Sequence, residues 1–142
     1  FTVEDQLQAL NEAIRVTKEG GILFVAYCGN DATMVQYCFG RGMLKEDKYR
    51  KLVDPVTFKA ASDPAELFEL YRKEDIDELI SRFNVQRLHY IGTDMATNYM
   101  RPVIDEMDDE FFALYLKYHF TICERADMVG TSHHILDVLR KE

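Results

Sequence analysis

Hydrophobic residues near the start of the chain recur with the period of an α-helix. The apolar positions, spaced by four, three and four residues, are Val3, Leu7, Leu10 and Ile14. Thr2 and Asp5 resemble a capping box, in which each residue satisfies a backbone N–H of the other. Gly20-Gly21 follows, and glycine can end a helix in a left-handed conformation. The pattern predicts an amphipathic helix that stops at the two glycines.

Directly after the glycines, the chain is apolar without alternation from Ile22 to Cys28. A run of this kind is typical of a strand that is buried on both faces of a parallel sheet. A helix, a tight turn and a buried strand make the second half of a βαβ unit, and no segment before the helix supplies the first strand. The chain therefore predicts an α/β fold from which the N-terminal half of the domain is missing.

The rest of the chain predicts further helices and strands around one polar segment. The helices are expected over 32–39, from Asp63 onward, over 73–82, over 96–106 with an interruption at Pro102, and over 108–124 after an Asp108 cap. The strands are expected over 85–91 and 132–140. Residues 40–62 are polar with little periodicity, so we expect a loop that contains at most a short helix.

Charge and composition exclude several classes of partner. The net charge of −8 is unsuited to binding nucleic acid, because phosphate contacts need clustered Lys and Arg. No apolar run approaches the roughly 18 residues of a membrane-spanning helix, and no secretory signal opens the chain. The cysteines are only three and widely spaced, which fits a reducing compartment. We expect a cytoplasmic protein that binds neither nucleic acid nor membranes.

Residues with metal-binding or nucleophilic chemistry are few. His133 and His134 are adjacent, so within a strand over 132–140 they would point to opposite faces and could not share a metal ion. We therefore expect no metal site. Cys28 ends the buried run and could act as a nucleophile, but a small buried core residue is the favoured interpretation.

Four residues at the end of the predicted strand are candidates for binding a ligand: Tyr27, Asn30, Met34 and Tyr37. Open α/β sheets bind ligands at the carboxyl ends of their strands. Asn30 could instead cap the following helix, which is the favoured alternative. Met34 and Tyr37 could line an apolar pocket, but at helical spacing core packing is the favoured alternative.

One stretch carries a resemblance to a known family. Residues 9–25 read ALNEAIRVTKEGGILFV. This stretch resembles class I methyltransferases that use S-adenosylmethionine, in which a run like ALxEAxRVxKxGGxxxV spans the helix before the fifth strand, a Gly-Gly turn and that strand. Glu19 stands where the family usually has proline. Residues 85–91 and 132–140 are similar to the family's last antiparallel pair of strands.

The resemblance implies that residues 1–142 are the C-terminal part of a single methyltransferase domain with a partial Rossmann-like sheet. In that family the positions that bind S-adenosylmethionine precede the matched helix, so none is expected here. Residues 30–62 would form a lid over the acceptor pocket. The substrate-binding residues for a small-molecule acceptor would be Tyr27, Asn30, Met34 and Tyr37. No catalytic residue is indicated, and the part alone is expected to be inactive.

The missing half has a physical consequence. Strand 22–28 would lose a neighbour, and an exposed apolar edge pairs readily with another copy, so self-association is expected. Two alternatives to the methyltransferase interpretation stay open. The first is a non-enzymatic interaction module that uses the Phe- and Tyr-rich helix over 111–122. The second is an unrelated, complete α/β enzyme.

Overall fold

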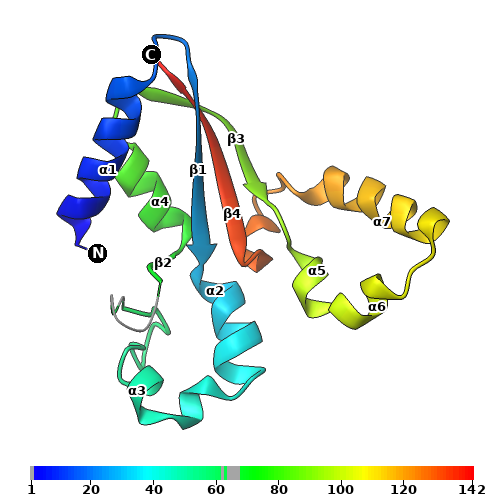
Figure 1. Ribbon diagram of the computed structural model, residues 1–142. Coiled ribbons are helices and arrows are strands. Elements are labelled where there is room, and N and C mark those ends of the chain that lie inside the picture. Colours follow the sequence, from blue (N-terminus) through cyan, green and yellow to red (C-terminus); the bar gives the residue numbers. More distant parts are fainter. Residues whose placement is uncertain (1, 62, 64–67) are drawn as a thin grey trace.

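The computed structural model describes residues 2–61, 63 and 68–142, and four strands form one mixed sheet (Figure 1). The sheet order is β2-β1-β4-β3, with β1 (Ile22–Gly29), β2 (Leu70–Tyr71), β3 (Val85–Gly92) and β4 (His134–Lys141). β2 runs parallel to β1, whereas β4 is antiparallel to both β1 and β3. The predicted α/β fold with a terminal antiparallel pair is confirmed. The sequence analysis missed β2.

The helices agree broadly with the periodicity of the sequence. They are α1 (Val3–Val16), α2 (Asn30–Thr33), α3 (Asp47–Arg50), α4 (Lys73–Ile80), α5 (Ala96–Tyr99), α6 (Arg101–Asp105) and α7 (Asp109–Ile122). The Thr2 hydroxyl accepts from the Asp5 N–H while the Asp5 carboxylate accepts from the Thr2 N–H, so the predicted capping box is present. Gly20 has φ of 71°, which explains why glycine stands at this turn.

Among the described residues, α1 and α4 cover one face of the sheet, and the other face meets a helix at its β3 end, where Ile91 packs against Ile122 of α7. α1 and α4 lie side by side on the first face (Figure 1), where Leu10 and Ile76 join the core cluster of the strands. Along β1, Leu23 and Tyr27 are buried on the covered face, whereas Phe24 is 70% exposed. Strand residues alternate between the two faces, so Phe24 lies on the open one.

The prediction that residues 22–28 are buried on both faces is therefore wrong. The apolar run is real, but Ile22 and Phe24 are exposed because no described helix lies over them. An apolar run without alternation predicts that other segments pack on both faces of the strand. The described part of the chain supplies such packing for β1 on one face. The sheet thus presents an apolar surface at β1.

A buried ion pair lies in the middle of the covered face. Asp137 of β4 is completely buried, and the Arg87 Nη2 of β3 donates to its Oδ2 at 2.9 Å. The Arg87 Nε lies 2.6 Å from the other carboxylate oxygen. Nη1 of the same side chain reaches Asp77 of α4 at 2.6 Å. Arg87 therefore joins both antiparallel strands to the helix that covers them.

The segment after β1 is more helical than predicted. α2 begins at Asn30 and continues as a π-helix over Met34–Phe39, and short helices occur at Met43–Lys45 and α3. An isolated bridge pairs Val53 with Ala60. Residues 40–61 thus contain two short helices, where at most one was expected, and are otherwise irregular, as predicted. The predicted helix start at Asp63-Pro64 extends over residues 64–67, which lie outside the described residues.

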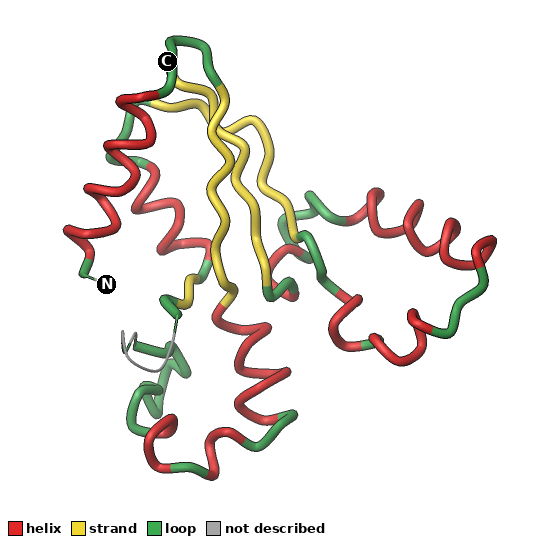
Figure 2. The backbone as a smooth tube through the Cα atoms, viewed as in Figure 1, coloured by secondary structure: helices red, strands yellow, loops and turns green. Residues whose placement is uncertain are grey.

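The last three helices form an arm that projects from the end of β3 (Figure 2). The predicted interruption of helix 96–106 is present, but it falls between Tyr99 and Arg101. Asp108 caps α7 through the Phe111 N–H at 2.8 Å. Many apolar side chains of this Phe- and Tyr-rich helix are exposed, among them Phe111, Leu114 and Tyr118. No described helix is long and apolar enough to cross a membrane.

Replacing Arg87 by Met is expected to destabilise the fold. The change leaves the Asp137 carboxylate buried without its cation, which costs on the order of 3 kcal/mol. Urea denaturation should show this loss in the free energy of unfolding. Arg82→Met is the matched control, because Arg82 pairs with Glu78 on the exposed surface of α4 and should cost less than about 1 kcal/mol. Equal losses in both variants would contradict a structural role specific to Arg87.

Candidate functional site

The end of β1, the end of β3 and the start of β4 converge on the carboxylate of Asp94. Its Oδ1 accepts from the Ser132 hydroxyl at 2.6 Å and from the backbone N–H groups of His133 and His134 at 2.8 and 3.2 Å. Its Oδ2 accepts from the Asn98 amide at 2.7 Å. Asp94 thus holds the segment that leads into β4.

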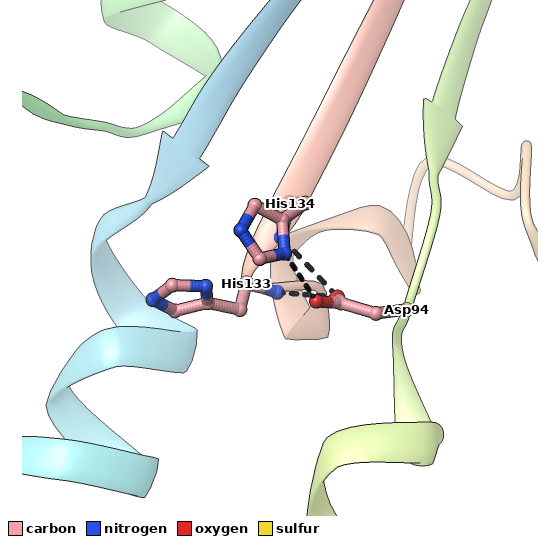
Figure 3. Close-up of side chains that lie close together, drawn as sticks. All are labelled: Asp94, His133 and His134. Atoms are coloured by element: carbon pink, nitrogen blue, oxygen red, sulfur yellow. Dashed lines mark hydrogen bonds and ion pairs between the residues drawn. The ribbon is translucent and has the colours of Figure 1, made fainter.

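The same carboxylate orients a histidine ring. Nδ1 of His134 lies 2.7 Å from Asp94 Oδ2, and Figure 3 shows Nε2 on the side of the ring that faces away from Asp94. Burial opposes ionisation of Asp94, but hydrogen bonds from Ser132 and His134 outweigh it and lower its pKa below the ordinary value. An ionised Asp94 favours the tautomer in which His134 carries its proton on Nδ1.

The backbone beside Asp94 is held in an uncommon conformation. Met95 is completely buried and has φ of 33°, which non-glycine residues rarely adopt. The Ser132 hydroxyl accepts from the N–H groups of Asp94 and Met95 at 3.1 and 3.0 Å and so supports this conformation. Strained backbone that the surroundings stabilise in this way is found preferentially at functional sites.

A small, mostly apolar cavity of about 210 Å³ lies next to the His134 ring. Its lining residues are Cys28, Thr33, Tyr37, Met43, Phe68, Leu70 and His133. Cys28 is the cross-strand partner of His134, and the rings of His133 and His134 have centroids 4.6 Å apart. The Tyr37 ring lies 5.0 Å from that of His133. Asp94 and His134 do not line this cavity themselves, but His133 and Cys28, which do, are the immediate neighbours of His134.

The structure separates the four predicted ligand-binding residues. Tyr37 lines the cavity beside His134. Tyr27 lies on the covered face of the sheet, where it packs against Tyr71 with ring centroids 5.3 Å apart, and burial next to Asp137 raises its pKa. Met34 is buried in a separate core cluster with Cys38 and Ala60. Tyr37 is thus the member of the set that stands beside the dyad.

Asn30 has a structural role that its sequence position did not indicate. Its side-chain oxygen accepts from the Ala60 N–H at 2.9 Å, and its amide donates to the Phe58 carbonyl at 3.1 Å. The favoured capping interpretation is wrong, because the residue at the cap position of α2 is Gly29 and no side chain caps that helix. Asn30 instead attaches the loop around residues 58–60 to the end of β1.

A second cavity, of about 360 Å³, lies near the opposite side of the β1 end and includes Asn30 among its lining residues. Arg72 contributes a cation to it, but the guanidinium is paired with the Asp31 carboxylate at 3.0 Å. Because the Asp31 carboxylate already neutralises the Arg72 guanidinium, that cation attracts an anionic ligand less strongly. The smaller cavity is the better candidate because it adjoins an oriented histidine.

The reason given for excluding a metal at His133 and His134 is incorrect. β4 begins at His134, so His133 precedes the strand, and potential ligand atoms of Asp94, His133 and His134 all lie within 4.8 Å of one another. In this structure the atoms are joined by hydrogen bonds: Asp94 accepts on both oxygens, and its Oδ2 lies 2.7 Å from His134 Nδ1. We describe the pair as a carboxylate–histidine dyad.

Cys28 lines the cavity, but its thiol is not activated. Burial, and secondarily the charge of Asp94, raises the pKa of Cys28, so the thiol stays protonated near neutral pH. Cys28, Cys38 and Cys123 are all free thiols, and none bonds to another. The favoured interpretation of Cys28 as a packing residue agrees with this environment.

The sequence analysis missed Asp94 and did not assign a role to His134. The signal lay in two expectations combined: Asp94 follows strand 85–91, and His134 begins the strand antiparallel to it. Antiparallel neighbours bring the end of one strand beside the start of the next. No protein-family model matches the chain, and no curated protein matches it significantly.

Asn30→Ala is expected to lower the free energy of unfolding by about 2 kcal/mol, because it leaves the buried Ala60 N–H without an acceptor. Limited proteolysis should then cut faster between residues 54 and 61. Asn84→Ala is the control, since Asn84 donates its amide at the exposed C-terminus. Unchanged stability in Asn30→Ala would contradict the structural role.

The stability of the fold should depend on the ionisation of Asp94. Because its pKa is lowered in the folded chain, its contribution is complete above the ordinary pKa of 3.8 and is lost as the pH falls below it. Asp94→Asn should therefore reduce the acid dependence of the unfolding free energy, measured by urea denaturation at several pH values. An unaltered pH dependence would rule out this contribution.

Proposed function

We propose that this chain is the C-terminal part of a class I methyltransferase that moves a methyl group from S-adenosylmethionine to a small-molecule acceptor. The observation that carries the proposal is the order of elements around β1. α1, the turn at Gly20 and β1 correspond to the stretch that resembles the family, and β4 lies antiparallel between β1 and β3. The resemblance implies a terminal antiparallel pair of this kind.

The described residues include candidates for binding the methyl acceptor. The cavity beside His134 is lined by apolar and aromatic groups, as small-molecule sites commonly are. Residues 30–61 wrap one side of it through Thr33, Tyr37 and Met43, which supports their role as a cover of the acceptor pocket. The described residues offer no glycine-rich turn after a strand for the methyl donor. We infer that residues outside this chain bind S-adenosylmethionine.

The direct test is calorimetric titration of S-adenosylmethionine into the longest form of the protein found in its cells, with residues 1–142 as a comparison. The proposal predicts micromolar binding to the longer form and none to residues 1–142, because the donor-binding positions lie outside them. Failure of the longest form to bind S-adenosylmethionine would contradict the proposed function.

The free edge of β1 supports the expectation of a missing half. β2 pairs with β1 only at Cys28 and Gly29, so the edge is open over the preceding residues of the strand. Ile22 and Phe24 add exposed apolar side chains beside that edge. We infer that strands of the absent half cover it in the complete domain, and that a second copy covers it when residues 1–142 stand alone.

Phe24→Lys should shift residues 1–142 from dimer toward monomer, because a charge beside the open edge disfavours burial against a second copy. Light scattering coupled to size-exclusion chromatography would measure the mass. Phe120→Lys is the matched control: Phe120 is exposed to a similar degree but lies on α7, away from the edge. A monomeric wild-type chain would overturn the inference.

One observation favours a second candidate function. The arm of α5, α6 and α7 exposes several large apolar residues: Tyr99, Met100, Val103, Phe111, Phe112, Leu114, Tyr118 and Phe120. Exposed apolar clusters of this kind commonly bind other proteins. A non-enzymatic interaction module would bind its partner through this arm and would not need the Asp94–His134 dyad. Loss of a partner on Leu114→Glu, with no methyl transfer by the longest form, would favour it.

A further inference from the structure

The dyad of Asp94 and His134 has the features of a general base. Asp94 accepts hydrogen bonds on both oxygens, from the Ser132 hydroxyl, two backbone N–H groups and the Asn98 amide, so its position is fixed. It therefore holds the proton of His134 on Nδ1, and Nε2 keeps its lone pair. Proton abstraction requires an accessible lone pair of this kind.

Accessibility distinguishes His134 from its neighbour. The His134 side chain is 58% exposed, whereas the His133 ring is half-buried and its Nδ1 is buried without a hydrogen-bond partner. Figure 3 shows Nε2 of His134 directed away from Asp94, toward the end of β1. Cys28, the strand partner of His134, and His133, whose ring centroid lies 4.6 Å from that of His134, both line the small cavity. His134 lies just outside this lining, so a group that extends from the cavity past His133 meets the His134 ring.

The volume and the lining of the small cavity limit which acceptor molecules can bind there. Its volume of about 210 Å³ lies below the roughly 300 Å³ at which drug-sized sites begin. The rings of Tyr37 and His133 supply an aromatic wall, and the Arg41 guanidinium lies over the Tyr37 ring, 4.4 Å from its centroid. A volume of this size admits only a small molecule, and the apolar and aromatic lining favours an aromatic ring over a charged acceptor.

We propose that His134, oriented by Asp94, is the general base that removes the hydroxyl proton of a small aromatic acceptor during methyl transfer. This inference rests on the proposed function. The acceptor O–H bond breaks, and the proton passes to Nε2. The acceptor oxygen forms a bond to the methyl carbon of S-adenosylmethionine. The S–C bond breaks and leaves its electron pair on sulfur, and the imidazolium then releases its proton to water.

The test compares two acceptors in the longest form of the protein. Phenol keeps its proton at pH 8 and needs a base, whereas 4-nitrophenol is largely ionised at that pH and does not. His134→Gln should reduce the rate of methyl transfer to phenol by about 100-fold or more and leave the rate with 4-nitrophenol within a few-fold of wild type. A merely structural role would lower both rates equally.

His89→Gln is the matched control. His89 is also exposed and also pairs with a carboxylate, at 3.0 Å from Glu124, but it lines neither of the two cavities described above. Both rates should stay at the wild-type level in this variant. Asp94→Asn should behave as a weaker form of His134→Gln, with phenol affected more than 4-nitrophenol.

The outcomes separate the two proposals. A wild-type protein that does not bind S-adenosylmethionine overturns both of them. If the wild-type protein binds S-adenosylmethionine but methylates neither phenol nor 4-nitrophenol, the aromatic acceptor and the general base are overturned. The proposed function then still stands. Equal losses with both acceptors in His134→Gln, or no loss with phenol, overturn the general base alone.

Discussion

The carboxylate of Asp94 is the interaction on which the site depends. It joins the segment after β3 to the start of β4 through Ser132 and two backbone N–H groups. Ser132 in turn supports Met95 in its left-handed conformation. Asp94 is a partly buried anion, and the hydrogen bonds that it accepts stabilise its charge while they hold the donor segments in place. The orientation of the His134 ring depends on this arrangement, because its Nδ1 lies at hydrogen-bond distance from Asp94.

The covered face of the sheet supplies the rigidity behind the site. Leu10 of α1 and Ile76 of α4 pack against the strands, and Arg87 ties β3 and β4 to α4 through Asp77 and Asp137. The strand ends that carry the dyad are therefore anchored along their length. The opposite face of β1 and its outer edge have no such support among the described residues, and under the proposed function they are the places where further strands and helices of the domain would pack.

Much of the fold was predictable from the sequence because local rules apply to it directly. The capping box of Thr2, the glycine turn at Gly20 and the Asp108 cap each act within four residues, so the sequence indicates them without tertiary context. The burial of strand 22–28 was not predictable in the same way. An apolar run indicates that its side chains are more stable away from water. It does not indicate which segment of the chain packs over them.

The candidate site required information that a single sequence does not contain directly. Asp94 and His134 are 40 residues apart, and the antiparallel register of β3 and β4 alone brings them together. Asn30 was misassigned for a related reason, since its partners Phe58 and Ala60 lie in a loop without periodicity. Tyr37 could be predicted as a pocket residue because the helical segment that leaves the end of β1, α2 followed by the π-helix Met34–Phe39, carries it close to the strand end.

The central claim is that Asp94 fixes His134 in the tautomer whose Nε2 is free to accept a proton. Long-range nitrogen–proton NMR on the histidine-labelled protein measures this directly, because the two ring nitrogens differ in shift according to which carries the proton. The account predicts a His134 protonated on Nδ1 at pH 8, and loss of that preference in Asp94→Asn. A His134 protonated on Nε2, or a ring unaffected by Asp94→Asn, would contradict the account.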